Sequence, residues 1–341
     1  MKQTMSRRER VLAALDHRQT DFVPYHADYT TQEHEKVADY LGDPDFEGKQ
    51  GYHLYYTQYM GAAQPIPGKA EFFRDDFGVV WNRSGADKDI GVIERPFVCD
   101  LEDYHFPEVR LDEDALHREY RAMMADKGDR FTFAGIGFTM FERAWSLCGM
   151  ENVLMAMLLN PEALDALLDD ICAFDMRVLD IALSYDFDAI YFGDDWGQQR
   201  GLIMGAKHWR RFIKPRMAML YARVKERGLR VIQHSCGDIA QVLPDLIEIG
   251  LDCYQTFQPE IYDIEAVKAA YGDRLTFWGG ISTQQLLPFA TPEQVKIEVA
   301  RLIGILGEGG GYIAAPTHAV PADVPPANIV AMNQALRGQR G

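Results

Sequence analysis

The stretch "VIQHSCGDIAQVLPDLIEIGLD", residues 231–252, decides the fold. An apolar run at 231–235 predicts a strand, and the pattern at 241–250 predicts a helix that leads back toward the next apolar run. In an extended segment, residues i and i+2 point to the same side, so His234 and Cys236 leave the end of the strand together. A nitrogen and a sulfur side by side form half of a zinc site, although an isolated H-x-C pair is also a frequent coincidence.

Strand and helix alternate from about residue 130 onward. The predicted strands are at 22–25, 131–136, 189–193, 231–235, 253–257, 275–280 and 312–316. The predicted helices are at 161–185, 206–228, 241–250, 264–272 and 292–307. Such alternation with short links predicts βα units around a parallel sheet. We therefore expect an α/β fold, a TIM (β/α)8 barrel, in which seven strands are found and the eighth has no assigned place.

An open, doubly wound sheet is the competing architecture. The two glycine-rich stretches, GGISTQ (279–284) and GEGGGY (307–312), lack the G-x-G-x-x-G spacing of a dinucleotide-binding turn. Residues 43–110 break the alternation and contain a predicted hairpin at 77–96. We expect this region to be an N-terminal insertion that caps one end of the barrel, within a single domain that spans 1–341.

Composition excludes several classes of protein. The 341 residues include 35 Lys and Arg against 51 Asp and Glu, a net charge of −16, and no basic tract, which argues against a nucleic-acid or anionic-membrane surface. No stretch approaches the roughly 20 apolar residues that span a bilayer. Five scattered cysteines suit a reducing compartment better than a disulfide framework. We expect a soluble, cytoplasmic protein; the oligomeric state has no sequence indicator.

Polar side chains follow nearly every predicted strand, where a barrel places its chemistry. We predict catalytic roles for four carboxylates, Glu142, Asp194, Asp195 and Glu260. We predict substrate-binding roles for Gln198, Gln258, Gln284 and Arg143. Simpler interpretations remain open, because Asp194 and Asp195 could cap a helix, and Glu142 with Arg143 could form a surface ion pair of little energetic value.

His234, Cys236 and His318 together predict a zinc site. Cysteine sulfur and histidine nitrogen are the usual ligands of zinc, at about 2.3 Å and about 2.0–2.1 Å respectively. His318 lies 82 positions beyond Cys236, so only the folded barrel can assemble the three ligands. Three protein ligands leave one position for a substrate, as in catalytic zinc sites, with Glu142 as an optional fourth.

These residues resemble the uroporphyrinogen decarboxylase-like superfamily, particularly its cobalamin-dependent methyltransferase branch. Besides the opening stretch, the resemblance rests on RRERVLAALDHRQTDFVPY (7–25), DAIYFGDDWGQQRGLIM (188–204), FIKPRMAMLYARVKERG (212–228) and GGYIAAPTHAVPADVPPANIVAMNQAL (310–336). It covers nearly the whole chain and implies a TIM barrel. In that branch an H-x-C pair and a distant cysteine bind zinc; His318 takes the place of the distant cysteine here, which is a departure.

The resemblance implies a zinc-dependent methyltransferase that moves a methyl group between a small methyl donor and a corrinoid (cobalamin) carried by a partner protein. Replacing one thiolate by a neutral imidazole leaves the metal more electrophilic, which favours activation of a methyl donor. Glu142, Asp195 and Glu260 are then candidates for orienting a cationic or hydroxylated donor or protonating its leaving group. A methylcorrinoid:thiol methyltransferase, in which the metal activates a thiol instead, stays as an alternative.

A uroporphyrinogen decarboxylase-type enzyme of porphyrin biosynthesis is the other main alternative. Its substrate carries eight carboxylates, which the enzyme meets with arginines in an R-Q-A-G-R-Y-like motif. That motif is absent here, since no arginine occurs between Arg18 and Arg74, and the net charge of −16 disfavours a polyanion. We rank it second, above a non-catalytic barrel that only binds a corrinoid or another ligand.

Overall fold

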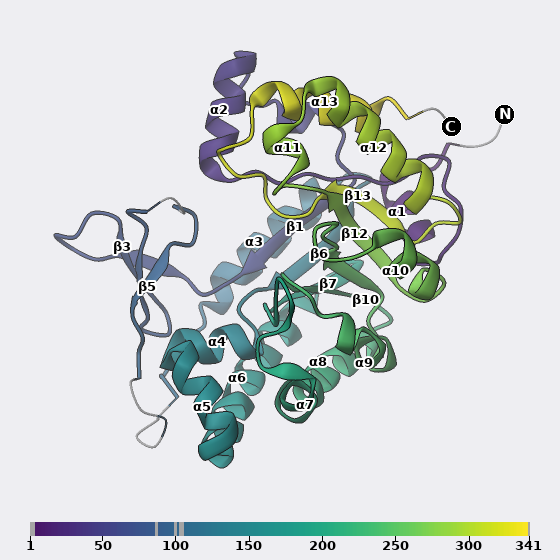
Figure 1. The fold of residues 1–341 in the computed structure, drawn as a ribbon. Helices are drawn as coiled ribbons and strands as arrows, with labels where there is room; N and C mark the ends of the chain where they lie inside the picture. Colours follow the sequence, from purple (N-terminus) through teal and green to yellow (C-terminus); the bar gives the residue numbers. More distant parts are fainter. Residues whose placement is uncertain (1–3, 86–87, 99–100, 102–105, 340–341) are drawn as a thin grey trace.

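The computed structural model of the chain describes residues 4–85, 88–98, 101 and 106–339. Its centre is a curled parallel sheet of seven strands in the order β1-β6-β7-β10-β11-β12-β13, an α/β arrangement consistent with a TIM-like barrel (Figure 1). The strands are β1 (Leu54–Tyr59), β6 (Phe131–Ile136), β7 (Ala189–Gly193), β10 (Arg230–His234), β11 (Cys253–Thr256), β12 (Thr276–Ile281) and β13 (Tyr312–Pro316). Six of these seven were predicted, and β1 was missed.

The two edge strands of this sheet are joined by the segment from Pro24 to His26. The Ala314 N–H in β13 donates to the Pro24 carbonyl at 2.8 Å, and the His26 N–H donates back to the Ala314 carbonyl at 3.1 Å. On the other side, the His53 N–H, directly before β1, donates to the Tyr25 carbonyl at 3.0 Å. The strand predicted at 22–25 is therefore reduced to a single parallel bridge, which lies between β13 and β1.

Helices surround the curled sheet, and those that follow β7, β10, β11 and β12 agree with the predicted ranges (Figure 1). The helices are α1 (Arg7–Leu15), α2 (Thr31–Leu41), α3 (Glu113–Asp126), α4 (Met140–Cys148), α5 (Met150–Leu159), α6 (Pro161–Ala182), α7 (Gly205–His208), α8 (Lys214–Glu226), α9 (Leu243–Glu248), α10 (Ile264–Tyr271), α11 (Leu286–Phe289), α12 (Pro292–Leu306) and α13 (Pro326–Arg337). The helix predicted at 206–228 is interrupted by a π-helical turn, Trp209–Ile213, just before Pro215, which has no N–H to donate.

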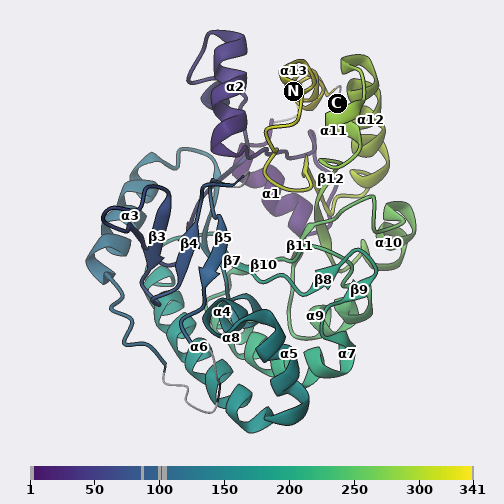
Figure 2. The ribbon, with the colours of Figure 1, turned by 60° about the vertical axis from the view of Figure 1, so that its left-hand side comes forward.

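The insertion predicted at 43–110 is not confirmed, because β1 lies inside that range and pairs with β6 in the main sheet. The remainder holds a separate antiparallel sheet of β2 (Ala63–Pro65), β3 (Phe72–Asp75), β4 (Val80–Asn82) and β5 (Val92–Arg95), seen beside the parallel sheet in Figure 2. The hairpin predicted at 77–96 is confirmed, since β4 and β5 pair antiparallel. The assignment of 1–341 to a single domain stays a prediction.

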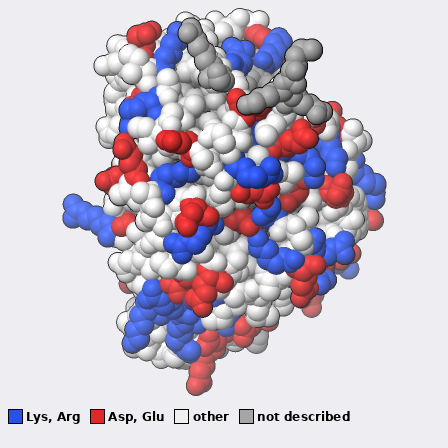
Figure 3. Space-filling model, turned by 90° about the vertical axis from the view of Figure 1, so that its right-hand side faces the viewer, with Lys and Arg blue, Asp and Glu red and all other residues white. Residues whose placement is uncertain are grey.

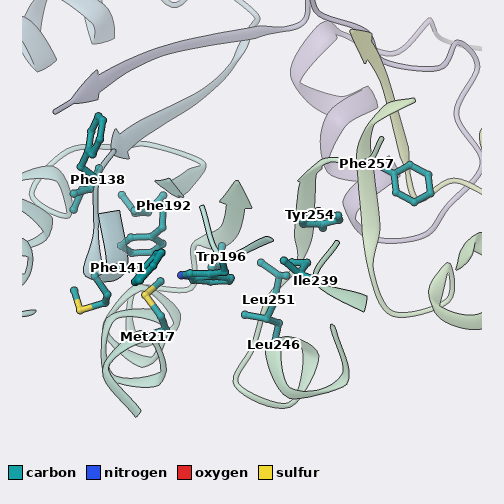
Figure 4. Close-up of a cluster of buried hydrophobic side chains, with 14 of the residues drawn as sticks. Phe138, Phe141, Phe192, Trp196, Met217, Ile239, Leu246, Leu251, Tyr254 and Phe257 are labelled. Atoms are coloured by element: carbon teal, nitrogen blue, oxygen red, sulfur yellow. The ribbon is translucent and has the colours of Figure 1, made fainter. Parts of the chain in front are cut away.

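The sheet is buried on both faces, as parallel sheets are. The inner face contains Phe133, Ile232 and Cys253, and α1 packs against it through Val11 and Leu15. The outer face packs against the surrounding helices, and Figure 4 shows part of that layer, with Trp196 between Phe192 and Leu246. Parallel strands in this setting read as continuous apolar runs, which is why six of them could be predicted.

One face of the molecule shows how the charged side chains are distributed. On the face shown in Figure 3, acidic and basic side chains are interspersed rather than gathered into a field of one sign. Among the described residues, no helix has both the length and the apolar character that crossing a membrane requires.

The inner layer predicts a large stability effect at Phe133, which is fully buried and stacks on Tyr56 with ring centroids 4.5 Å apart. We expect Phe133→Ala to lower the free energy of unfolding by about 3–5 kcal/mol, because the lost ring leaves a cavity. Urea-induced unfolding measures this change. Phe289→Ala, at a side chain that is 78% exposed, is the control and should change stability by less than about 0.5 kcal/mol. Equal effects of the two substitutions would contradict the inner layer described here.

Candidate metal centre

A cavity of about 200 Å³ lies at the carboxyl ends of the parallel strands. Five strands supply part of its walls: Tyr56 from β1, Tyr191 from β7, His234 from β10, Gln255 from β11 and Trp278 from β12. Three carboxylates and a histidine complete the charged lining, with Asp28, Asp195 and His318 in loops and Glu142 in the first turn of α4. The cavity therefore occupies the place where barrel enzymes hold their chemistry.

The three predicted zinc ligands meet at this cavity. One ligand atom from each of His234, Cys236 and His318 lies within 4.8 Å of the other two. The Cys236 sulfur is 3.6 Å from His234 Nε2. A sulfur at about 2.3 Å and a nitrogen at about 2.05 Å from one tetrahedral zinc ion would themselves be about 3.6 Å apart. The donor set and this separation fit a zinc ion.

Hydrogen bonds fix the orientation of the His234 ring. Its Nδ1 donates to the side-chain carbonyl of Gln255 on the neighbouring strand. Its Nε2 is thereby directed toward the Cys236 sulfur, and it lies 3.2 Å from Asp195 Oδ1. The same Asp195 oxygen accepts the Cys236 backbone N–H at 2.8 Å. Metal-binding histidines usually engage a carboxylate or carbonyl through the other ring nitrogen, which is the role that Gln255 has here.

The glycine after Cys236 is explained by a close crossing of two loops. The Gly197 N–H donates to the Cys236 carbonyl at 3.2 Å, and the Asp238 N–H donates to the Gln198 carbonyl at 2.9 Å. Gly237 has φ +80°, and a Cβ there would lie 2.2 Å from the Gly197 carbonyl carbon. Only glycine allows the loops after β7 and β10 to approach this closely, and the crossing holds Cys236 at the cavity.

The surroundings raise the pKa of Glu142 and of Cys236 and lower the pKa of Asp195. Burial and the nearby Asp195 and Asp194 raise the pKa of Glu142 well above its usual value. Burial also acts to raise the pKa of Asp195, but hydrogen bonds from His234 and Cys236 outweigh it and lower this pKa to about 2. Burial raises the pKa of the Cys236 thiol. A bound cation would reverse this last shift by stabilising the thiolate.

Asp194 and Asp195 are neighbours in sequence but have different surroundings. Asp194 is fully buried and does not line the cavity. Its carboxylate accepts the backbone N–H groups of Phe141 at 2.9 Å and Glu142 at 2.7 Å, in the first turn of α4, and the indole N–H of Trp196. The structure thus gives Asp194 the helix-capping position that the sequence left open, while Asp195 faces the cavity.

Four residues lie outside the cavity lining, namely Glu260, predicted to be catalytic, and Gln198, Gln258 and Gln284, predicted to bind substrate. The Gln258 side chain is buried and accepts the Gly237 N–H at 3.0 Å, so it supports the loop that carries Cys236. Glu260 accepts a hydrogen bond from Ser282, and the side chains of Gln198 and Gln284 are exposed. The roles predicted for these four residues therefore stay predictions without a contact in the cavity.

Arg143 does not form the surface ion pair with Glu142 that the sequence left open. It is buried, 3.5 Å from Asp75, with its guanidinium 3.8 Å above the ring centre of Phe77. Its Nη2 donates to the carbonyl of Met60 at 2.9 Å, and Met60 lines the cavity. Arg143 thus supports the cavity wall from behind instead of facing a ligand.

Sequence reasoning missed the cavity residues that lie within strands instead of after them. Tyr191 and Gln255 belong to runs that were predicted correctly, and both point into the cavity. A glutamine inside an apolar strand is a usable signal, because buried polar groups need a partner. Tyr56 had no such signal, since β1 was not predicted. Asp28 follows the strand predicted at 22–25 by three residues and was not recognised as a site residue.

Comparison with known proteins identifies related chains. The family model described as uroporphyrinogen decarboxylase (URO-D) matches residues 86–339. A methylated-thiol–coenzyme M methyltransferase of Methanosarcina mazei is 25% identical over 155 residues, 46% of this chain and 40% of that protein. A uroporphyrinogen decarboxylase of Psychromonas ingrahamii is 24% identical over 177 residues, 50% of this chain and 46% of that one. The chain thus spans about half the length of the curated relatives it matches.

A solved structure extends the comparison to the whole fold. A methyltransferase from Methanosarcina mazei superposes with a TM-score of 0.74 over 98% of this chain and 99% of its own, at 18% sequence identity. That likeness shows a shared fold. The curated relative from the same organism, 25% identical over its matched part, is also named as a methyltransferase.

The surroundings of Asp194 predict a structural effect that Asp195 does not share. We expect Asp194→Asn to lower the free energy of unfolding by about 1–3 kcal/mol, because an amide group would face buried N–H donors. The matched control is Asp273→Asn, at a side chain that is 77% exposed. Chemical denaturation of both variants measures the difference. If Asp194→Asn were as stable as the control, the capping position would have no energetic importance.

Proposed function

Since the chain belongs to the uroporphyrinogen decarboxylase (URO-D) family, we propose that it is a zinc-dependent methyltransferase acting between a small methyl donor and a corrinoid protein. The observation that carries the proposal is the convergence of His234, Cys236 and His318 at the cavity. The relative named as a methylated-thiol methyltransferase adds support for methyl transfer. The corrinoid partner follows from the resemblance of the H-x-C motif to cobalamin-dependent methyltransferases.

We also propose that the curled sheet is a complete TIM (β/α)8 barrel in which residues 24–26 occupy the eighth strand position. Their hydrogen bonds to Ala314 and to His53 connect the two edge strands, as an eighth strand would. The cavity then opens at the rim, where a partner protein can approach. The antiparallel sheet of β2–β5 is an addition beside this barrel.

The side chains of the cavity have distinct tasks in this proposal. His234, Cys236 and His318 hold the metal, and zinc, when bound, supplies Lewis acidity to an oxygen or sulfur of the donor. The methyl group leaves without the bonding electron pair, which stays on that heteroatom, and cobalt(I) of the partner supplies the pair of the new bond. Glu142 lines the cavity, and burial together with Asp195 and Asp194 raises the pKa of its carboxyl group, which favours the protonated form. It can give that proton to the leaving heteroatom.

A reaction directed at a thiol is the second candidate, and the name of the Methanosarcina mazei relative favours it. A thiol acceptor would bind as a thiolate, which needs a metal with a donor set rich in negative charge. His234, Cys236 and His318 offer one thiolate and two neutral imidazoles, a more electrophilic set. We therefore prefer activation of a methyl donor.

Decarboxylation of a porphyrinogen ranks below both methyl transfers, although several relatives have the name uroporphyrinogen decarboxylase. The described lining of the cavity includes the carboxylates Asp28, Glu142 and Asp195 and has no lysine or arginine. A substrate with eight carboxylates would be repelled by that lining, and the net charge of −16 adds to the repulsion.

The metal site predicts one zinc ion per chain. We expect Cys236→Ser and His318→Ala each to lose stoichiometric zinc while the protein stays folded, because the apolar core does not depend on the metal. Mass spectrometry of the purified protein measures the zinc content. Cys172→Ser, a buried cysteine of α6 outside the cavity, is the matched control and should retain zinc. Full zinc content in both site variants would overturn the assignment.

Zinc binding should also depend on pH with a definite sign. Burial raises the pKa of the Cys236 thiol, so at neutral pH the free site holds a proton that the metal must displace. Affinity for zinc should therefore fall as the pH is lowered. Titration calorimetry in two buffers of different ionisation enthalpy counts the protons released per zinc bound. A count of zero at neutral pH would contradict a protonated thiol in the free site.

Methyl transfer itself can be tested with a corrinoid protein reduced to cobalt(I). Zinc-loaded protein and a methyl donor should produce methyl-cobalt(III), which its absorbance spectrum reports, and Cys236→Ser should abolish the reaction. Conversion of uroporphyrinogen to coproporphyrinogen by the same preparation would instead favour the decarboxylase. Transfer to thiols alone, with every methyl donor inactive, would favour the second candidate.

A further inference from the structure

The floor of the cavity is aromatic. Tyr56, Tyr191 and Trp278 all line it, and all three pack around the buried Phe133, with ring centroids at 4.5, 5.7 and 5.8 Å from that ring. Tyr191 and Trp278 also contact one another in a T-shaped arrangement at 6.3 Å. Faces of electron-rich rings attract organic cations, and the attraction is strongest in a desolvated pocket.

A carboxylate stands beside this floor. Asp28 lines the same cavity, and its Oδ1 lies 3.1 Å from His26 Nε2. The His26 ring in turn packs against Tyr56 at 5.7 Å and Trp278 at 6.3 Å. Burial acts to raise the pKa of Asp28, but His26 and Tyr56 outweigh it and hold this pKa below its usual value. The carboxylate therefore keeps its negative charge at neutral pH.

The described lining of the cavity includes the carboxylates Asp28, Glu142 and Asp195 and no lysine or arginine. The net charge of the chain is −16. A ligand with a positive charge therefore matches this lining better than an anion does. The volume of about 200 Å³ is below the range of drug-sized sites, so the ligand must be small.

We propose that the cavity recognises a small organic cation, whose ammonium group is held by Asp28 and by the faces of Tyr56, Tyr191 and Trp278. The oxygen or sulfur of the same molecule then faces His234, Cys236 and His318. This substrate class, an ammonium-bearing methyl ether or thioether, rests on the proposed function. Recognition of the cation, by contrast, is a binding property that can be measured without methyl transfer.

Two molecules of the same shape test the role of charge. Choline carries a quaternary nitrogen where 3,3-dimethyl-1-butanol carries a neutral carbon, and the two molecules are otherwise alike. We expect titration calorimetry with the purified protein to show choline binding at least about tenfold more tightly than the alcohol. This comparison needs no variant. Equal affinities, or tighter binding of the alcohol, would overturn the proposal.

A substitution then locates the cation. Asp28→Asn should weaken choline binding about tenfold or more and leave the affinity for the alcohol unchanged. Asp39→Asn, at an exposed side chain of α2 outside the cavity, makes the same change in net charge and should leave both affinities unchanged. Equal losses in the two variants would show that choline responds to overall charge, which contradicts the proposed site.

The experiments distinguish failure of the proposed cation site from failure of the proposed methyltransferase function. If choline binds through Asp28 but no methyl transfer to cobalt(I) occurs with any donor, the cation site stands and the methyltransferase proposal fails. If neutral methyl ethers or thioethers are good donors while choline does not bind, methyl transfer stands and the cation site is wrong.

Discussion

The arrangement of this protein depends on the joining of two sheet edges by three residues. Backbone hydrogen bonds from the segment 24–26 reach Ala314 on one side and His53 on the other. A sheet that curls in this way brings the carboxyl ends of its parallel strands toward a common rim. That is the reason His318, after the last strand, lies within 4.8 Å of ligand atoms on β10 and the loop that follows it.

Around that rim, polar side chains divide into those that face the cavity and those that hold the loops in place. Asp194 and Gln258 are buried and accept backbone N–H groups, from the first turn of α4 and from Gly237. Asp195 combines both tasks, since it lines the cavity and accepts the Cys236 N–H. The three candidate metal ligands are thus surrounded by a second layer of hydrogen bonds that fixes the orientation of their loops.

The side chains of the cavity, rather than the scaffold, carry the information about its ligand. The described lining holds carboxylates and aromatic rings and no lysine or arginine, and it lies next to a nitrogen and sulfur donor set. These features are the basis on which we propose a small ligand that is not an anion.

The sequence by itself determined the parallel α/β class, six strands and the three candidate metal ligands, because buried parallel strands read as apolar runs and H-x-C follows one of them. It could not assign β1, whose LYYTQY run mixes aromatic and polar residues, nor the single bridge at Tyr25. Only the tertiary structure decided that Asp195 faces the cavity while Asp194 caps a helix. The physical reason is that the curl of the sheet and the loop crossing at Gly197 and Gly237 bring together residues that are distant in the chain. These long-range contacts decide whether a side chain faces the cavity or points away from it.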